Sequence, residues 1–509
     1  MSEQSSAPCG SITVFASLSL LLTASFLLAL LEAARVKGLD AYSRMQRVNA
    51  MESVFSMYDR ELFDQYGIFL LDGTFGSETL QFSQINGYLQ AASQKNLRPV
   101  VPAQAWKSAH NFYQADAADA SVTGYLLATD YDGGPFRKMA VESMKSVYPA
   151  ELAKTLYGKL QSADQALEQA QQSRTAMEQA QEDIQAAKEQ QAQAAETESS
   201  GEAVSPPAEV LVENPIDVIK TLKKADILTL VLPSGSRVST KSIQGAQTLE
   251  HRSLLHGNEP WQKEGGWYEA VLYQQFLQTH FACYENGSRG DGILDYELEY
   301  IQAGKKTDRD NLKSVVRQLL MLREGINFLY LQTDMAKRQE AYGVATALAA
   351  GFGIAPAAGV IAQGILAAWA YAESILDVRA LLAGSKVEWM KTAESWSSSL
   401  SGLGGLLSGS VQAKPRESGI DYKGYLQKLL WLKTERVLNY RAMDLLELQS
   451  DVSGVGTRNM NAMLLALRAD FSYVAEPLFS KMVTLQRLRA DQWDFSESVY
   501  YSYFLNSER

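Results

Sequence analysis

The most apolar part of the chain is its N-terminal segment, Ser11 to Leu31, whose 21 residues include eight leucines and no charge. At 1.5 Å per residue, a helix of this length spans about 32 Å, enough to cross a hydrocarbon core of about 30 Å. No Lys or Arg precedes the segment, and it is longer than the apolar region of a cleaved secretory signal. The pattern therefore predicts a transmembrane helix over residues 11–31, after a short leader of residues 1–10.

Beyond the apolar segment, hydrophobic residues recur at spacings of three and four, which is typical of an amphipathic helix with one apolar stripe. Gly38 weakens such a helix by only about 1 kcal/mol relative to Ala. We therefore expect the transmembrane helix to continue as an amphipathic stem over residues 32–64 that packs on the protein's own body. The stripe consists of Val36, Leu39, Tyr42, Met45, Val48, Met51, Val54, Phe55 and Tyr58.

The rest of the chain alternates short apolar runs with long amphipathic stretches, which indicates a helix-rich α+β body. Residues 65–158 are its first part, with short strands predicted at "QYGIFLLDG" and "SVTGYLLATDYDGG". Residues 214–509 are its second part, which begins with a helix and a strand in "PIDVIKTLKKADILTLVLP". Aromatic alternation in "FSYVAEPLFS" and "ESVYYSYFL" predicts a closing hairpin.

Two long helices are predicted in this second part, "RDNLKSVVRQLLMLREGINFLYLQTDMAKRQEAY" and "YKGYLQKLLWLKTERVLNYRAMDLLELQS". Asp308 or Asp310 is available to cap the start of the first. Between them, the 32 residues from Ala341 to Ala372 carry no charge and consist mainly of Ala and Gly. Since "GFGIAP" favours a turn, we predict a buried helical hairpin over residues 341–384 that ends at a Gly384 cap, with a membrane-inserted hairpin as the alternative.

Two segments of biased composition separate the parts of the body. Residues 159–198 are rich in Gln, Ala and Glu and predict a coiled-coil-like helical arm. Residues 199–213 predict an acidic flexible linker. The expected seam of the arm follows heptad spacing through Leu160, Ala163, Leu167, Ala170, Met177 and Ile184, and the same register contains Arg174, Gln181 and Lys188.

Composition narrows the classes of function. The chain has 509 residues, of which 46% are hydrophobic and 10% aromatic, as in proteins that fold. A formal net charge of -11 argues against nucleic acid as a partner, because phosphate binding relies on clustered Lys and Arg. Two cysteines cannot form a disulfide framework.

Candidate chemistry is sparse. Glu373 and Asp377 are four residues apart on one helical face, with Arg379 nearby. Paired carboxylates can perform acid–base work when their surroundings separate their pKa values. We predict instead that these three residues are structural and form an ion-pair network with Arg323 or with Glu297 and Glu299. No catalytic residue, cofactor or metal site is predicted.

The N-terminal segment also resembles a known family. "GSITVFASLSLLLTASFLLALLEAAR" is similar to the start of TadE/TadG-like proteins of the tight-adherence (Flp) pilus system, in which a small-residue junction precedes a hydrophobic helix. The resemblance implies a processing junction between Gly10 and Ser11. Phe15, five residues after Gly10, stands where pilins usually carry Glu.

Three further blocks resemble an uncharacterised family of membrane-anchored proteins of Gram-positive bacteria, often encoded beside tight-adherence pilus genes. They are "YELEYIQAGKKTDRDNLKSVVRQLLMLREGINFLY", "WAYAESILDVRALLAGSKVEWMK" and "YKGYLQKLLWLKTERVLNYRAMDL". The resemblance implies a single-pass protein of the cell membrane with its body outside. The positive-inside rule, applied alone to Arg35, Lys37, Arg44 and Arg47, places the body in the cytoplasm.

These features together predict a non-enzymatic structural or assembly component of a tight-adherence pilus-like or secretion system, whose partners are the lipid bilayer and proteins of that system. One alternative is a surface module that binds cell-wall glycan or another ligand, since Trp261 and Trp267 lie in an aromatic stretch. Another is a membrane-bound enzyme that works through Glu373 and Asp377.

Overall fold

The computed structural model divides the chain into two compact units that interleave along the sequence. Unit 1 comprises Met1–Met139, Leu254–Lys263 and Gly456–Arg509, and unit 2 comprises Ala140–Ser253 and Glu264–Val455. The structure describes residues 9–77, 79–97, 113, 115–160, 163–197, 214–243, 248–263, 265–287, 292–406, 411–413, 416–453, 458–479, 481 and 492–504. The predicted linker, residues 199–213, and most of the predicted leader lie outside these residues.

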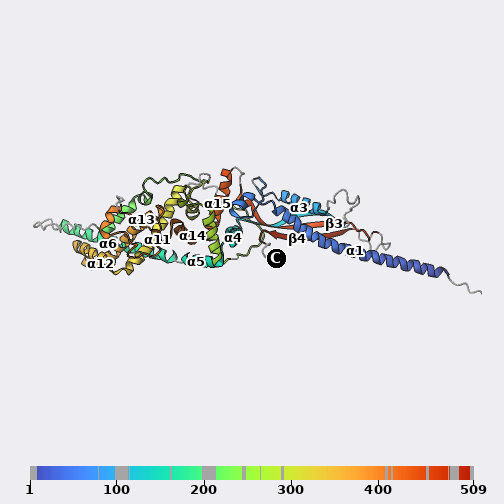
Figure 1. The fold of residues 1–509 in the computed structure, drawn as a ribbon, viewed down its shortest axis with the longest axis horizontal. Coiled ribbons are helices and arrows are strands. Elements are labelled where there is room, and N and C mark those ends of the chain that lie inside the picture. The colour runs from blue at the N-terminus through green and yellow to red at the C-terminus, as the bar shows by residue number, and fades with distance from the viewer. Residues whose placement is uncertain are drawn as a thin grey trace, which may run out of the picture. The chain divides into compact units, whose positions relative to one another are not determined.

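A single helix, α1 (Cys9–Phe55), contains both the apolar segment and the stem. It passes Gly38 without a break, as predicted, and Figure 1 shows it in blue beside β3 and β4. The stem helix is shorter than predicted, because a separate helix, α2 (Arg60–Tyr66), follows it. The Asp59 side chain accepts the N–H of Leu62 and so fixes the start of α2.

Unit 1 is built on an antiparallel sheet in which β3 is central and pairs with the other three strands. Alternate residues of β3, including Phe471 and Tyr473, form a core with α1 and α3. The predicted pairing of the two aromatic C-terminal segments is confirmed, since Phe471 lies opposite Glu497. The elements are β1 (Leu71–Asp72), α3 (Phe82–Leu97), β2 (Ala115–Leu127), β3 (Met463–Ala475) and β4 (Trp493–Ser502).

The buried face of the stem differs from the predicted stripe. Met45 is 52% exposed, whereas Arg47 is only 1% exposed. Arg47 is buried because the sheet satisfies its charge: its Nη2 lies 2.8 Å from Glu497 Oε2 on β4, and its guanidinium lies over the Tyr473 ring. The stem face therefore combines apolar residues with the buried polar residues Glu32, Arg35, Ser43, Gln46 and Arg47.

In the described residues of unit 2, the regular secondary structure is helical, and irregular segments and two isolated bridges connect the helices. Residues Ile227–Val231, predicted as a strand, form a helix instead. Both long predicted helices are interrupted, the first at Asp334, which ends α11 and accepts the N–H of Lys337 to begin α12. The helices are α5 (Ala150–Leu160), α6 (Ala163–Thr197), α7 (Pro215–Lys224), α8 (Ile227–Val231), α9 (Trp267–His280), α10 (Glu297–Ala303), α11 (Asp308–Thr333), α12 (Met335–Gly351), α13 (Ala358–Leu382), α14 (Tyr422–Trp431) and α15 (Glu435–Ser453). Helix α4 (Asp130–Lys145) spans the sequence boundary between the units.

The Gln/Ala/Glu-rich segment forms α6, whose small residues pack on α11 and α13 of the same chain. The buried seam of α6 shares Ala170, Met177 and Ile184 with the predicted seam, but its other positions lie one residue earlier than predicted. Arg174 and Gln181 therefore lie beside the seam and are partly exposed. Packing is close because α11 and α13 present Gly325 and Gly364 to α6, where a Cβ would overlap Ala166 and Ala180 respectively. The buried positions are Ala166, Ala170, Ser173, Met177, Ala180, Ile184 and Ala187.

The Ala/Gly-rich segment forms the antiparallel pair α12 and α13. The turn between them uses Gly353, whose φ of 72° favours glycine. Helix α13 ends at Gly384, with a φ of 82° and a bond from the N–H of Ser385 to the carbonyl of Ala380, which is a Schellman cap.

Within the described residues, two helical segments are long and apolar enough to cross a membrane, Ile12–Phe55 and Ala355–Leu382. The most apolar window of the first is entirely unburied, whereas 83% of that of the second is buried inside the protein. The first therefore fits a membrane anchor or a signal sequence, and the second fits a core helix.

Candidate functional site

The end of the apolar segment of α1 is the first candidate site. Glu32 directly follows this segment, is 3% exposed, and lies 2.7 Å from Arg35 Nη2. A buried carboxylate needs several hydrogen-bond donors, and unit 1 supplies them. The N–H groups of Leu478 and Phe479 donate to Glu32 Oε2 at 3.2 and 2.7 Å, and Trp493 Nε1 donates to Oε1 at 3.1 Å.

Arg35 completes this junction. It donates to the Tyr113 carbonyl, just before β2, and to the Glu476 carbonyl, just after β3. The Glu32–Arg35 pair thus fixes one end of the sheet to α1 at the level where the apolar segment ends. Sequence reasoning missed this role, and its only local signal is a Glu and an Arg three residues apart beside the apolar segment. Gly10 and Ser11, the implied processing junction, lie within the first turn of α1.

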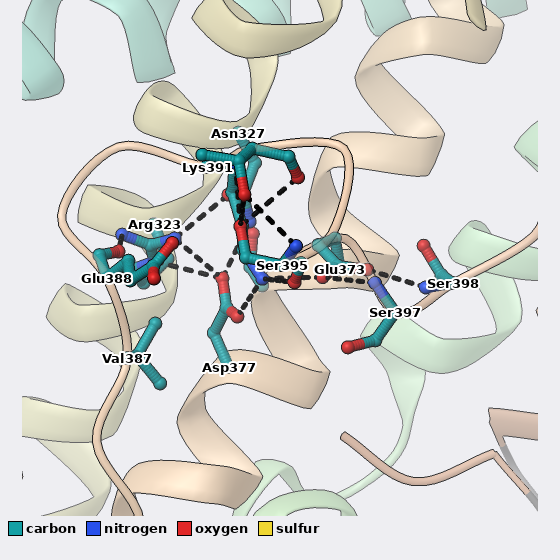
Figure 2. Close-up of polar contacts among 12 residues, drawn as sticks. Arg323, Asn327, Glu373, Asp377, Val387, Glu388, Lys391, Ser395, Ser397 and Ser398 are labelled. Carbon is teal, nitrogen blue, oxygen red and sulfur yellow. Dashed lines mark hydrogen bonds and ion pairs between the residues drawn. The ribbon is translucent and has the colours of Figure 1, made fainter. Parts of the chain in front are cut away.

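The second candidate site is the predicted carboxylate pair on α13. Glu373 is 0% and Asp377 3% exposed, and Lys391, from the segment after α13, lies 2.6 Å from both of them. Glu373 also accepts the N–H groups of Ser397 and Ser398 at 3.0 and 2.8 Å (Figure 2). The carboxylate therefore holds one stretch of the following segment against the helix.

Asp377 faces a second cation, Arg323 on α11. Arg323 Nε and Nη2 lie 2.9 Å from Asp377 Oδ2, which also accepts the amide of Asn327 at 2.9 Å. Arg323 Nη1 donates to the carbonyl of Glu388 (Figure 2) and to that of Trp389. Burial alone would raise the pKa of Asp377, but the two cations outweigh it and hold the pKa below its ordinary value.

The network therefore joins α11, α13 and the segment 387–398 through charges that are matched and enclosed. Arg323, one of the partners predicted from the sequence, does bind Asp377. Arg379 lies outside this network and donates to the carbonyls of Leu230, Leu406 and Val411. Lys391 was missed, because it reaches the helix from an irregular segment 14 residues after Asp377.

Residues 207–475 match a family described as a family of unknown function, DUF5702. The match covers more than half of the 509 residues. This chain belongs to the DUF5702 family. The DUF5702 region contains the whole Glu373–Asp377 network and β3, whereas α1 and β4 lie outside it. Neither curated proteins nor solved structures gave a match to the chain.

A third polar cluster of the DUF5702 region lies around α10. Glu299 is 0% exposed, accepts the Tyr422 hydroxyl at 2.6 Å, and has one oxygen, Oε2, without a hydrogen-bond partner among the described residues. Burial raises the pKa of Glu299 to about 7. Burial also raises the pKa of Asp444, which accepts the Tyr300 hydroxyl, to about 7. Glu297 instead accepts the N–H of Ala282, so these glutamates belong to a different network from Glu373.

The described part of this DUF5702 protein contains no cluster of three or more His, Cys, Asp or Glu suited to a metal ion. Cys283 is buried, and burial raises the pKa of its thiol to about 12. Asp130 accepts the N–H groups of Leu127 and Gly257 and so joins two segments of unit 1. The carboxylates that sequence reasoning singled out therefore bind backbone N–H groups, hydroxyls and buried cations.

Proposed function

We propose that this chain is a membrane-anchored structural or assembly component of the bacterial cell envelope that serves a tight-adherence pilus-like or secretion system without catalysing a reaction. One observation carries the proposal. The unburied apolar half of α1 continues without a break into a half that is fixed to a sheet by the hydrogen bonds of the buried Glu32–Arg35 pair and by the Arg47–Glu497 ion pair.

The apolar half of α1 exposes large hydrophobic side chains. Residues such as Phe15, Leu20 and Phe26 are 73%, 71% and 63% exposed. Removing apolar surface from water is favourable by about 25 cal/mol per Å², so a helix of this kind is stable in lipid or against other apolar helices. A continuous helix then fixes the body at a set distance from the membrane, as a structural subunit requires.

Membrane fractionation tests the anchor. Leu21→Arg with Leu28→Arg should move the protein from the membrane to the soluble fraction, because two charges in the hydrocarbon core cost several kcal/mol. Ala41→Arg, at an exposed position of the stem, is the matched control and should stay in the membrane. Retention of the double variant would contradict the anchor.

N-terminal sequencing of the membrane-bound protein distinguishes a retained membrane anchor from a signal sequence that is cleaved off. A start at Met1 or Ser11 supports an anchor, and a start beyond residue 34 means that the helix is a removed signal. A reporter that is active only outside the membrane, fused to the C-terminus, tests the proposed extracytoplasmic side. Co-purification of pilus or secretion proteins tests the proposed partners.

The two alternatives are supported by fewer observations. Trp261 and Trp267, which suggested one glycan-binding surface, belong to different units. Glu373 and Asp377, which suggested an enzyme, are enclosed and bonded to cations and backbone N–H groups. A peptidoglycan pull-down with the full chain tests the glycan alternative, because the structural proposal expects no glycan binding.

A further inference from the structure

The sheet of unit 1 ends beside the residue at which the apolar segment ends. Ala475, the last residue of β3, lies opposite Ala115 and Trp493, the first residues of β2 and β4. The indole of Trp493 and the backbone of Leu478 and Phe479 all donate to Glu32. Since Glu32 follows the apolar segment by one residue, this end of the sheet lies at the level where α1 would leave the hydrocarbon core.

The side chains at this end are those that suit a membrane–water interface. Leu478, Phe479 and Trp493 are each half-buried, so part of each side chain is free to contact lipid. Tryptophan is enriched at the level of the headgroups, and apolar side chains beside it insert into the boundary with the acyl chains. Lys481 and Glu476, which form an exposed 2.7 Å ion pair in the same segment, are polar side chains suited to the headgroup region rather than to the acyl chains.

The hydrogen-bond donors that Leu478, Phe479 and Trp493 place at this end are already satisfied. The two N–H groups and the indole N–H donate to Glu32, and Arg35 balances the charge of this carboxylate. Unpaired backbone donors would be costly in a medium poor in water. Because Glu32 accepts them, Leu478, Phe479 and Trp493 can enter the headgroup region without leaving these donors unpaired.

We propose that Leu478, Phe479 and Trp493 form a membrane-interface surface that rests in the headgroup region of the bilayer holding α1. The partner of this surface is lipid, because the surface is continuous with the helix that enters the bilayer. The inference rests on the proposed membrane insertion of α1 and adds a second point of contact, which restricts the tilt of unit 1 relative to the membrane.

Depth-dependent quenching tests this surface with the full chain in phosphatidylcholine vesicles that carry bromine either near the headgroups or near the bilayer centre. The emission of Trp493 is obtained as the difference between the unaltered chain and Trp493→Phe. We expect shallow bromines to quench this emission about twofold more strongly than deep ones, because an interfacial tryptophan lies at the level of the headgroups. Leu21→Trp in the Trp493→Phe background reports insertion of α1 and should be quenched most by deep bromines.

The outcomes separate the two proposals. Loss of quenching at Leu21→Trp contradicts the anchor itself. Quenching at Leu21→Trp without quenching of Trp493 overturns the interface surface and leaves the anchor intact. Trp493 emission that instead changes with the protein-to-lipid ratio identifies a second copy of the chain as the occupant and also overturns the proposal.

A second measurement uses the unaltered chain, so it does not depend on the folding of a variant. A photoactivatable lipid with its reactive group at headgroup level should label the peptide that contains Leu478 and Phe479 together with peptides of α1. Labelling of α1 without labelling of this peptide would overturn the interface surface.

Discussion

Arg323 and Asp377 lie 54 residues apart in the chain and meet in the interior of unit 2, with 2.9 Å between Arg323 Nε and Asp377 Oδ2. Both side chains are nearly inaccessible to water, at 0% and 3% exposure. Charges in such a place are tolerated only when they are paired and hydrogen-bonded. The pair therefore specifies how α11, α13 and the segment after α13 fit together.

Arg323→Met should lower the stability of unit 2 by about 3–5 kcal/mol, because it leaves a buried carboxylate with one cation fewer. Arg317→Met is the matched control on the same helix, and its exposed position predicts a change within about 0.5 kcal/mol. Urea unfolding monitored by hydrogen exchange of α13 measures both. Equal stability of the two variants would show that the ion pair does not hold the helices.

Gly325→Ala should destabilise the packing of α6 on α11 by about 1–3 kcal/mol, because the added Cβ overlaps the Ala166 carbonyl. Gly343→Ala, on α12 with open space around its Cα, should instead raise stability by about 1 kcal/mol through helix propensity. The same unfolding measurement should show a lower free energy of unfolding for Gly325→Ala and a higher one for Gly343→Ala. A stabilising Gly325→Ala would mean that α6 does not pack at this distance in solution.

Glu299 makes the stability of unit 2 depend on pH. Its pKa of about 7 exceeds the ordinary value of 4.5, so between these values the folded protein holds a proton that the unfolded chain has released. Raising the pH through this window therefore lowers the free energy of unfolding. Glu299→Gln should reduce the loss between pH 5 and pH 8, measured as the unfolding temperature at each pH.

Asp444 contributes to the same window, since burial also raises its pKa to about 7. The double variant Glu299→Gln, Asp444→Asn should therefore depend on pH less than either single variant. Glu151→Gln, at an exposed position of α5, is the control and should retain the dependence of the unaltered chain. An unchanged pH profile in Glu299→Gln would contradict the assignment.

Glu32→Ala should loosen the end of the sheet, because it leaves three N–H donors and the Arg35 charge without their acceptor. Hydrogen exchange of the Leu478 and Phe479 amides should accelerate about tenfold or more, which corresponds to the loss of at least about 1.4 kcal/mol of local stability. Glu52→Ala, at an exposed position of the same helix, should leave these amides unchanged. Unchanged exchange in Glu32→Ala would exclude the junction.

The local pattern was sufficient to predict continuous structure along α1 and the pairing of the aromatic C-terminal strands, because both depend on period and length. The local pattern could not predict which face of a helix is buried when that face contains polar residues whose partners lie far away in the sequence. Met45 is exposed while Arg47 is buried, since the partner of Arg47 is Glu497, 450 positions away. Periodicity contains no information about such a partner.

The same limit applies to α6 and to the carboxylate network. Heptad spacing predicted a buried seam on α6. The observed register places Ala166 and Ala180 of α6 against Gly325 of α11 and Gly364 of α13, where no space is left for a larger side chain. The spacing of Glu373 and Asp377 placed them on one face, whereas their shared cation, Lys391, comes from an irregular segment. The cap of α11 also differs from the predicted one, since the side chain of Thr307, rather than Asp308 or Asp310, accepts a backbone N–H of the first turn, that of Asp310.

The central position of β3 also affects how the protein is made. A ribosome completes α1, α3 and β2 early, but it synthesises β3, the strand that joins them, only after all of unit 2. All of unit 2 is translated in between and can fold first. The stem of α1 therefore lacks the central strand of its sheet until unit 2 has been synthesised, and a chain that stops before Met463 leaves that face uncovered for chaperones and proteases to recognise.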